Sequence, residues 1–375
     1  MLTTIAVQNY RSLSNLVIPL GGLNLITGPN GSGKSNIYRA LRLLAETAQS
    51  GVIASVANEG GIESAFSATP TQAKKRGPKR LRLGLGGDEL GYSISLGLPA
   101  LGPDNPTAFR RDPEIKHECI WAGPSYNPVG ALVERNDGVV KVRSSRTWEV
   151  TNQHFDKMDS ILGSPAVSDS APGVIELREL VRSWRFYDQF RTDGEAPSRL
   201  PQIGTRTPVL HHDGRDLAAA IQTIREIGDF DALESAIEDA FPGSRISVLT
   251  SNDHFSVELE QPGLLRPLSA MELSDGTLRY LLWVAALLTP RPPPLMVLNE
   301  PETSLHPELV PALARLIVDA SARSQVWVIS HSDVLIAELT KSESCNWMRI
   351  GKDEGETSIL DLPLTEQAVW RWPDR

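Results

Sequence analysis

The stretch Gly28-Pro29-Asn30-Gly31-Ser32-Gly33-Lys34-Ser35 constrains the fold more than any other part of this chain. It follows the apolar run Leu23–Ile26 and precedes Lys34–Ala48, where apolar residues recur at helical spacing. A strand, a glycine-rich turn and a helix in this order match the phosphate-loop pattern G-x-x-x-x-G-K-[ST]. A tight turn without a ligand is the alternative, but the strand and the helix both stand where the motif requires them. The sequence therefore predicts an α/β core that binds a nucleotide.

This phosphate loop (Gly28–Ser35) predicts a division of work among its residues. Backbone N–H groups and the helix N-terminus surround the phosphates, because both carry positive potential. Lys34 is expected to bridge the β- and γ-phosphates of ATP, and the Ser35 hydroxyl is expected to bind Mg²⁺. The residues expected to contact the nucleotide are Gly28, Pro29, Asn30, Gly31, Ser32, Gly33, Lys34, Ser35 and Asn36.

A second segment, Leu295–Glu300, is an apolar strand that ends in polar residues, as a Walker B element does. Glu300 is the candidate for polarising the attacking water, and the residue before it would hold a metal-bound water. That earlier position is usually Asp, but here it is Asn299, which can accept a hydrogen bond and brings no negative charge. A buried strand with a capped end is the alternative, and the following Glu-Pro-Glu-Thr-Ser-Leu-His-Pro disfavours it. ATP hydrolysis is therefore less secure than ATP binding.

Two further segments carry candidate nucleotide contacts. In Leu273–Thr277, called here the signature segment, Ser274 stands at a helix start and the backbone of Gly276 is open to a ligand. An ordinary helix N-cap is the alternative, but the segment lies just ahead of the Walker B strand. His331 follows the predicted strand Val326–Ile329 and could contact the γ-phosphate, although a lone histidine is more often a satisfied polar group.

Together, these motifs and the opening Val7–Ser12 resemble the ATP-binding-cassette heads of the RecF/SMC class, close to small bacterial RecF-like and OLD-like ATPases. The resemblance implies that two heads enclose two ATP molecules head to tail. Ser274 and the Gly276 N–H of one chain would then bind the γ-phosphate held by Lys34 of the other. Glu300 and His331 would be the catalytic pair, with His331 orienting the water. Gln189 is a weak candidate for the glutamine that the class carries between its two halves.

The order of the motifs predicts an α/β fold, a P-loop NTPase head of the ABC type with a mixed β/α insertion lobe. Residues 1–125 and 262–375 are expected to form the head, and residues 126–261 the insertion lobe. Within that lobe, Asn136-Asp137-Gly138 predicts a hairpin turn. Residues 213–241 have a helical pattern that Gly228 and Asp229 are expected to break into two helices.

Charge and cysteine content limit the partners and the compartment. Because the net charge is −9, nucleic-acid binding would need a local basic patch, and Lys74–Arg82 is the most basic stretch. A solvated loop is the alternative reading of that stretch. Arg178, Arg182 and Arg185 are expected on one helix face, where they could extend a basic track or pair with nearby glutamates such as Glu176 and Glu179. Two separated cysteines, no apparent signal peptide and no long apolar run favour a cytoplasmic protein without a membrane segment.

Three functions remain open from the sequence. The first is an ATP-hydrolysing homodimer that acts on DNA, in repair or in defence against phage or plasmids. The second is a regulatory ATP switch that controls an effector protein such as a nuclease or toxin, with little hydrolysis. The third, a transporter subunit, is disfavoured because 240 positions separate Lys34 from Ser274. A nuclease of the OLD type is disfavoured because only 44 residues follow His331. His211-His212-Asp213 is interpreted as a loop.

Overall fold

The computed structural model describes residues 1–49, 51–69, 78–99, 108–144, 147–151, 155–163, 171–188, 190–360 and 369–373. They fall into two compact units. Unit 1 contains Met1–Gly21, Gly28–Trp184 and Met348–Arg375, and unit 2 contains Gly22–Thr27 and Arg185–Trp347. Helices and sheets occur in both units, which confirms the predicted α/β class. The compact units do not follow the expected limits of 126 and 261, so that division of the chain stays a prediction.

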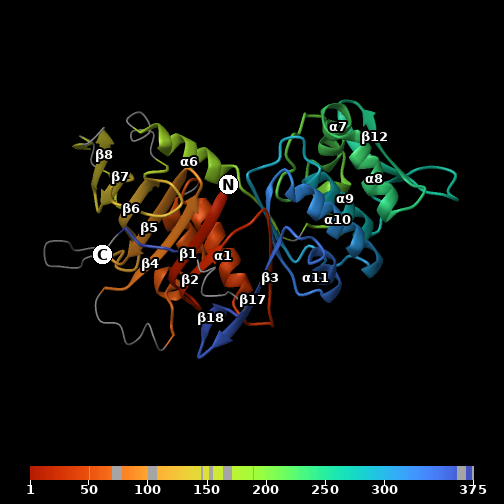
Figure 1. Cartoon of the computed structure of the whole chain (residues 1–375). Coiled ribbons are helices and arrows are strands. Elements are labelled where there is room, and N and C mark those ends of the chain that lie inside the picture. The colour runs from red at the N-terminus through yellow and green to blue at the C-terminus, as the bar shows by residue number, and fades with distance from the viewer. Residues whose placement is uncertain are drawn as a thin grey trace. The chain divides into compact units, whose positions relative to one another are not determined.

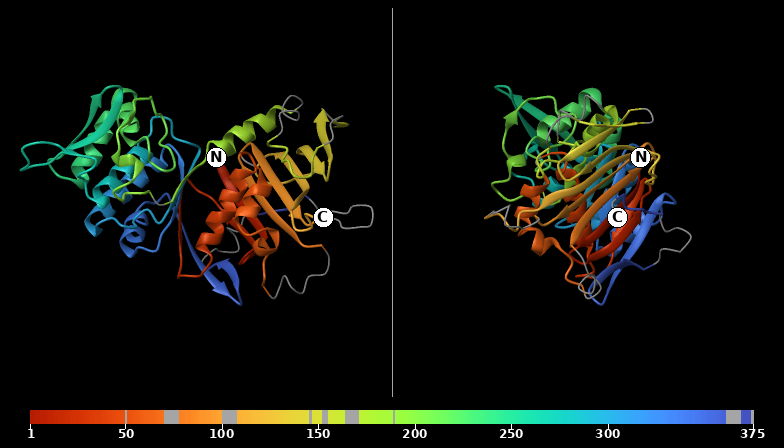
Figure 2. Two further views of the ribbon diagram at one scale, coloured as in Figure 1. Left: turned by 180° about the vertical axis from the view of Figure 1, so that it is seen from behind. Right: turned by 90° about the vertical axis from the view of Figure 1, so that its left-hand side faces the viewer.

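Unit 1 is built on an eight-stranded antiparallel sheet with the strand order β2-β1-β4-β5-β6-β7-β8-β9 (Figure 1; Figure 2, right). Consecutive strands mostly pair with each other, as expected for a meander, and β1 pairs with both β2 and β4. The strands are β1 (Leu2–Tyr10), β2 (Leu13–Pro19), β4 (Arg80–Gly87), β5 (Leu90–Gly97), β6 (Glu114–Ala122), β7 (Ala131–Asn136), β8 (Val139–Ser144) and β9 (Thr147–Val150).

Side chains are buried on both faces of β5, which explains its glycine content. All of its residues after Leu90 are buried. The Trp121 ring lies where a Cβ at Gly91 would stand, so any larger residue would overlap it. Trp121 is 0% exposed and contacts Trp370 edge to face. Among the residues that the structure describes, the helices of unit 1 are α1 (Lys34–Glu46), α2 (Val52–Asn58), α3 (Ile62–Ala65) and α6 (Pro172–Arg182).

Unit 2 contains a parallel sheet in which β10 (Arg185–Tyr187), β15 (Leu295–Asn299), β16 (Gln325–Ile329) and β3 (Leu23–Thr27) are neighbours in that order. All residues of β3 and β16 are buried, as expected for parallel strands covered on both faces. The path continues through β17 (Cys345–Asp353), which runs from unit 2 into unit 1, to β18 (Glu356–Ile359).

Helix α9 (Asp275–Leu287) is the centre of the core of unit 2. Every residue from Leu278 to Leu287 is buried, so the helix is covered on all sides. The other helices of the unit are α7 (Leu217–Ile227), α8 (Phe230–Ala240), α10 (Val310–Ser321) and α11 (Asp333–Leu339), with the short 3₁₀ helices η1 (Pro197–Arg199) and η2 (Pro307–Leu309). A second sheet is formed by β11 (Gln202–Ile203), β12 (Arg245–Ser251), β13 (His254–Glu260) and β14 (Leu268–Ser269).

The structure confirms several local predictions and corrects one. The turn at Asn136-Asp137-Gly138 joins β7 to β8, and the break at Gly228-Asp229 separates α7 from α8. The Asp229 side chain accepts a hydrogen bond from the Ala232 N–H, so it caps the second helix. The expected row of Arg178, Arg182 and Arg185 on one helix is wrong, because α6 ends at Arg182 and Arg185 begins β10.

Candidate nucleotide site

The phosphate loop connects β3 to α1 in the predicted order. Gly31 and Gly33 have φ values of 79° and 113°, a left-handed region that favours glycine. The loop therefore turns sharply into the N-terminus of α1, whose backbone N–H groups can bind an anion. The Lys34 ammonium group donates to the carbonyl oxygens of Gly28 (2.5 Å) and Pro29 (3.2 Å). Lys34 is only 7% exposed, so its charge is held inside the loop.

A hydroxyl network supports the phosphate loop from within unit 1. The hydroxyl of Thr357, on β18, donates to the Ser32 carbonyl (2.8 Å) and lies 2.7 Å from the Ser12 hydroxyl. The Asn36 amide donates to the same Ser12 oxygen (2.9 Å). A Cβ at Gly33 would overlap the Thr357 side chain, so the glycine also permits this close approach. Asn36 thus contacts Ser12, which belongs to the network that supports the loop. The expected contact of Asn36 with the nucleotide stays a prediction.

One hydroxyl group of the phosphate loop indicates that the loop can hold a phosphate. The Ser32 hydroxyl is buried and has no hydrogen-bond partner among the described residues. A buried hydroxyl without a partner is costly and needs a reason. A phosphate oxygen held in the loop would supply the missing partner. This orphan hydroxyl supports the assignment of ATP to the loop.

The predicted catalytic residues follow adjacent parallel strands. Glu300 follows β15 and His331 follows β16, and the carboxyl ends of these strands lie at one edge of the sheet. The phosphate loop begins at Gly28, directly after β3, which is the next strand in that sheet. The His331 Nδ1 atom lies 3.4 Å from a Glu300 carboxylate oxygen, and both side chains are about half exposed. The structure brings this pair together, and their catalytic roles remain predictions.

Glu302 organises the turn that carries this pair, a role that sequence reasoning missed. Its side chain is 7% exposed. One carboxylate oxygen accepts from the Ser330 hydroxyl (2.6 Å) and from the N–H groups of His331 (3.3 Å) and Ser332 (3.2 Å). Glu300 has φ 49°, an uncommon conformation for a residue with a side chain, and its N–H donates to the Ile329 carbonyl (2.8 Å). The Glu-Pro-Glu spacing was the only sequence feature that pointed to Glu302.

The signature segment forms the exposed start of α9. The Ser274 hydroxyl caps this helix by accepting from the Thr277 N–H (3.2 Å), so the N-cap reading is correct as local structure. Beside it, Gly276 faces a turn of the same unit: a Cβ there would lie 3.5 Å from the Ser304 carbonyl oxygen and 4.0 Å from the His306 nitrogen. The segment therefore presents a hydroxyl and a helix N-terminus to the solvent. Their contact with a γ-phosphate stays a prediction.

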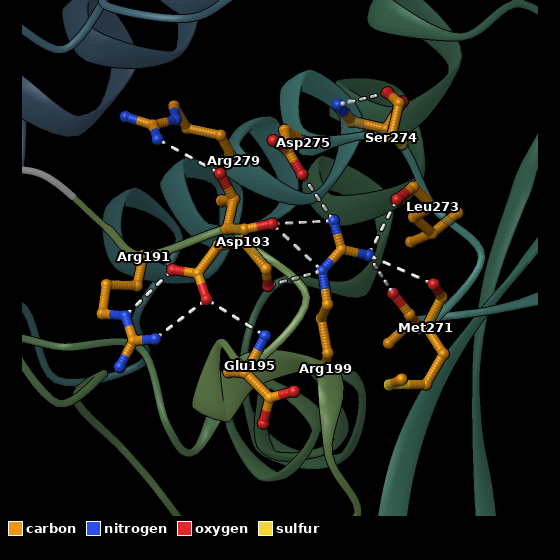
Figure 3. Close-up of polar contacts among 12 residues, drawn as sticks. Arg191, Asp193, Glu195, Arg199, Met271, Leu273, Ser274, Asp275 and Arg279 are labelled. Carbon is orange, nitrogen blue, oxygen red and sulfur yellow. Dashed lines mark hydrogen bonds and ion pairs between the residues drawn. The ribbon is translucent and has the colours of Figure 1, made fainter.

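A second feature that sequence reasoning missed is Arg199, whose guanidinium group contacts the signature segment (Figure 3). Its side chain is 5% exposed and donates 2.7 Å to a carboxylate oxygen of Asp275. Nothing in the local sequence marks it, because 76 positions separate the two residues.

The two residues expected to hold the metal, Asn299 and Ser35, lie on different elements. Asn299 is half-buried at the end of β15, and Ser35 is exposed in the first turn of α1. Both offer neutral oxygen atoms, which suit Mg²⁺ only together with the phosphates of a nucleotide.

His211, His212 and Asp213 also come together, with ligand atoms within 4.8 Å. The Arg215 guanidinium occupies that cluster, however, lying 3.0 Å from Asp213, so a positive charge already balances the carboxylate.

Some sequence predictions fall on residues outside the described ranges. Gln189 is one of them, and so is the part of the basic stretch formed by Lys74, Lys75 and Arg76. Lys79 and Arg80 are described, at the start of β4. No helix among the described residues has both the length and the apolar character needed to cross a bilayer.

Comparison with known protein families gives two matches along the chain. Residues 130–337, more than half of the chain, match the family described as "AAA domain, putative AbiEii toxin, Type IV TA system". Residues 1–75, which include the phosphate loop, match the family described as "AAA ATPase domain".

Two curated proteins resemble short stretches of the chain. The OLD nuclease of Thermus scotoductus is 48% identical over 44 residues, which cover 12% of this chain and 8% of that protein. The DNA replication and repair protein RecF of Prosthecochloris aestuarii is 51% identical over 47 residues, which cover 12% and 13%. The chain thus matches only about a tenth of the length of these relatives.

Solved structures of SMC heads resemble the whole chain in fold. An SMC head bound to the C-terminal winged-helix domain of ScpA superimposes with a TM-score of 0.52 at 15% identity, covering 97% of this chain and 99% of that one. The SMC head domain from Thermotoga maritima gives a TM-score of 0.50 at 13% identity, with the same coverage. These likenesses show that the fold resembles that of an SMC head. Because the family match spans residues 130–337, the chain belongs to the AAA-domain family of that description.

Proposed function

We propose that this chain binds and hydrolyses ATP and that ATP joins two copies of it head to tail. The observation that carries the proposal is the presence of two helix starts suited to phosphate in one chain. One is the phosphate loop with the unpartnered Ser32 hydroxyl, and the other is the exposed signature segment. One nucleotide held by Lys34 needs one phosphate loop. A second copy of the chain would give the signature segment its phosphate.

In this proposal each residue has a defined task. Lys34 holds the β- and γ-phosphates, and Mg²⁺ bound by the phosphates and Ser35 would neutralise their charge. Ser274 and the Gly276 N–H bind the γ-phosphate of the second copy. Glu300 accepts a proton from the attacking water, and His331, 3.4 Å from Glu300, orients that water. Because Asn299 has no charge, we propose that ATP-driven closure is the main event and turnover is slow.

The test uses the Glu300→Gln variant, which keeps the shape of the side chain and removes the base. We expect it to bind ATP and to accumulate as an ATP-bound dimer, with hydrolysis reduced by a factor of about 10² to 10⁴. Light scattering with and without saturating ATP measures the mass. Lys34→Ala in the same background is the control and should stay monomeric, since it removes the phosphate contact. A Glu300→Gln protein that binds ATP and remains a monomer would rule out the two-headed site.

We further propose that the closed dimer acts on DNA, in repair or in defence against phage or plasmids. Two proteins that resemble short stretches of this chain, a RecF repair protein and an OLD nuclease, support this proposal by their names. The alternative is a regulatory switch for an effector protein. The neutral Asn299 and the word "toxin" in the family description favour that alternative.

A DNA-binding measurement separates these two functions. Replacing Lys79 and Arg80 with Gln, together with Lys74, Lys75 and Arg76, should weaken DNA binding by the ATP-bound dimer. It should also flatten the dependence of affinity on salt, because each lost phosphate contact releases about one counterion fewer. Binding is measured by fluorescence anisotropy on duplex DNA between about 50 and 200 mM salt. If the wild type binds no DNA at low salt, the effector alternative is favoured.

A further inference from the structure

Arg199 donates hydrogen bonds from all three of its guanidinium nitrogens, and several of its partners lie in or next to the signature segment. The Nε–H donates to the carbonyls of Thr192 (3.0 Å) and Asp193 (3.1 Å). One terminal nitrogen donates to the carbonyls of Ala270 (2.7 Å) and Leu273 (2.8 Å). The other donates to the Thr192 carbonyl (2.8 Å) and to an Asp275 carboxylate oxygen (2.7 Å). Figure 3 shows several of these bonds, those to Leu273 and Asp275 among them, spreading from one guanidinium group.

The bonds fix the backbone that leads into the signature segment. A buried arginine is stable only when its donors are satisfied, and the planar guanidinium can bind several carbonyls in a fixed arrangement. Arg199 joins two strips of chain, Thr192–Asp193 and Ala270–Leu273, that are far apart in sequence. The second strip ends one residue before Ser274. Its carbonyl groups therefore set where α9 begins and where its first N–H groups point.

Asp275 gives this arrangement a second consequence. The carboxylate stands between Ser274 and Gly276, the two residues assigned to the γ-phosphate. Its side chain is 63% exposed, so it is not itself buried in the core. An unpaired carboxylate at this position would repel a bound phosphate, because like charges at short range oppose each other. The bond to the buried Arg199 guanidinium offsets that charge.

We propose that Arg199 is a positioning residue for the signature segment: it fixes the segment's backbone and neutralises Asp275, so that the segment can accept the γ-phosphate of a second copy. This inference rests on the function proposed above. It adds a residue that touches no nucleotide and a reason why an acidic side chain is tolerated beside a phosphate.

The test measures ATP-driven dimerisation in the Glu300→Gln background. We expect Arg199→Met to weaken dimerisation about tenfold or more, because charge-assisted hydrogen bonds are lost at the segment. The isolated chain should still bind ATP through its own phosphate loop. Arg199→Lys keeps the charge but not the planar guanidinium group. Its dimerisation should therefore be weaker than that of the parent and stronger than that of Arg199→Met. Adding Asp275→Asn to Arg199→Met should recover part of the loss, since it removes the repelling charge. Arg315→Met, which removes a surface ion pair with Asp239 in the same unit, is the matched control.

A mixing experiment separates a local effect from misfolding. The Arg199→Met chain keeps its phosphate loop, and the Lys34→Ala chain keeps its signature segment. Mixed in the Glu300→Gln background with different tags, they can form one complete ATP site, so ATP should let each capture the other although neither captures itself. If capture fails and Arg199→Lys also loses ATP binding, Arg199 is only a core residue and the proposal is overturned.

Two further outcomes are decisive. If the Glu300→Gln parent dimerises and Arg199→Met dimerises within about twofold of it, well under the loss expected for such bonds, this inference is wrong and the proposed function stands. If the parent itself does not dimerise with bound ATP, the proposed function is wrong and this inference falls with it.

Discussion

Arg135 in unit 1 and Arg199 in unit 2 are both buried arginines that donate to backbone carbonyls and to one carboxylate. Arg135 and its partner Glu118 are each 0% exposed and 3.0 Å apart. Arg199 is 5% exposed, but its partner Asp275 is 63% exposed. The same side chain thus makes a closed contact in one unit and a contact that reaches the surface in the other.

The Arg135 contact is complete within the core. Arg135 also donates to the carbonyls of Asp137, Asp156 and Asp159. Glu118 accepts in addition from the Ile161 N–H (3.1 Å) and the hydroxyls of Tyr92 (2.7 Å) and Ser160 (2.6 Å). Burial, and secondarily the Glu118 carboxylate, raise the pKa of the Tyr92 hydroxyl well above its usual range.

The difference between the two contacts separates stability from function. Each side-chain nitrogen of Arg135 and each carboxylate oxygen of Glu118 has a hydrogen-bond partner in the protein. The pair therefore joins β6 and β7 to the chain around Asp156–Ile161. The Arg199–Asp275 pair ends at an exposed carboxylate beside the signature segment, where a docking partner would alter it. We therefore expect loss of Arg135 to act on folding, and loss of Arg199 to act first on assembly.

The largest expected effect on stability comes from Arg135→Met. It leaves the Glu118 carboxylate buried without a counter-charge, which typically costs about 3–5 kcal/mol. Denaturant unfolding, followed by tryptophan fluorescence, measures the free energy of unfolding. Glu118→Gln added to Arg135→Met should restore part of it, because a neutral amide can still accept from Tyr92 and Ser160.

The matched change in unit 2 is Asp275→Asn, which removes an exposed partner. It should cost no more than about 1 kcal/mol, because the Asp275 side chain is 63% exposed and the amide oxygen of Asn can still accept from Arg199. Equal losses of stability from the two changes would remove the contrast between a closed and an exposed arginine contact.

The short-range features of this fold were readable in the sequence, and the contacts just compared were not. The phosphate loop, the two helices divided at Gly228-Asp229 and the β15 strand before Glu300 follow from local patterns of glycine, charge and apolar spacing. The sequence did not predict the eight-stranded sheet of unit 1, because strand order depends on pairing between distant segments.

Partners that are distant in sequence leave no local pattern. The Ser12 and Thr357 hydroxyls that support the phosphate loop are 345 positions apart. Arg199 reads in the sequence as one arginine among many in a proline-rich stretch, and only the fold places it behind Asp275. Glu302 lies in the Glu-Pro-Glu segment that follows β15, yet its bond to Ser330 depends on the pairing of β15 with β16. Residues that belong to a local motif were thus easier to single out than residues that hold such a motif in place.

The smallest expected effect concerns a third arginine, which is exposed and holds the same strip of chain from outside. Arg266 donates to the Glu272 carboxylate (2.6 Å), which also accepts from the Ser269 N–H (3.0 Å). The Arg266 bond first, and then those from Ser269, lower the pKa of Glu272 from 4.5 to about 2. A lowered carboxyl pKa stabilises the folded state above the unfolded pKa. That contribution is present above about pH 4.5 and is lost as the pH falls towards 2.

Glu272→Gln should therefore lower the urea midpoint slightly at pH 7, and the difference from the wild type should shrink as the pH falls from 5 to about 2. Arg266→Gln is the matched change, because it leaves the carboxyl group but removes the first cause of its shift. In that variant the pH-dependent step should move up towards 4.5. A difference between Glu272→Gln and the wild type that stays constant over this range would show that the carboxylate contributes no charge-dependent stability. In that case the buried Arg199, and not the exposed Arg266, would hold the strip Ala270–Leu273 through its charge. The difference between this strip and the closed Arg135–Glu118 pair of unit 1 would then be larger.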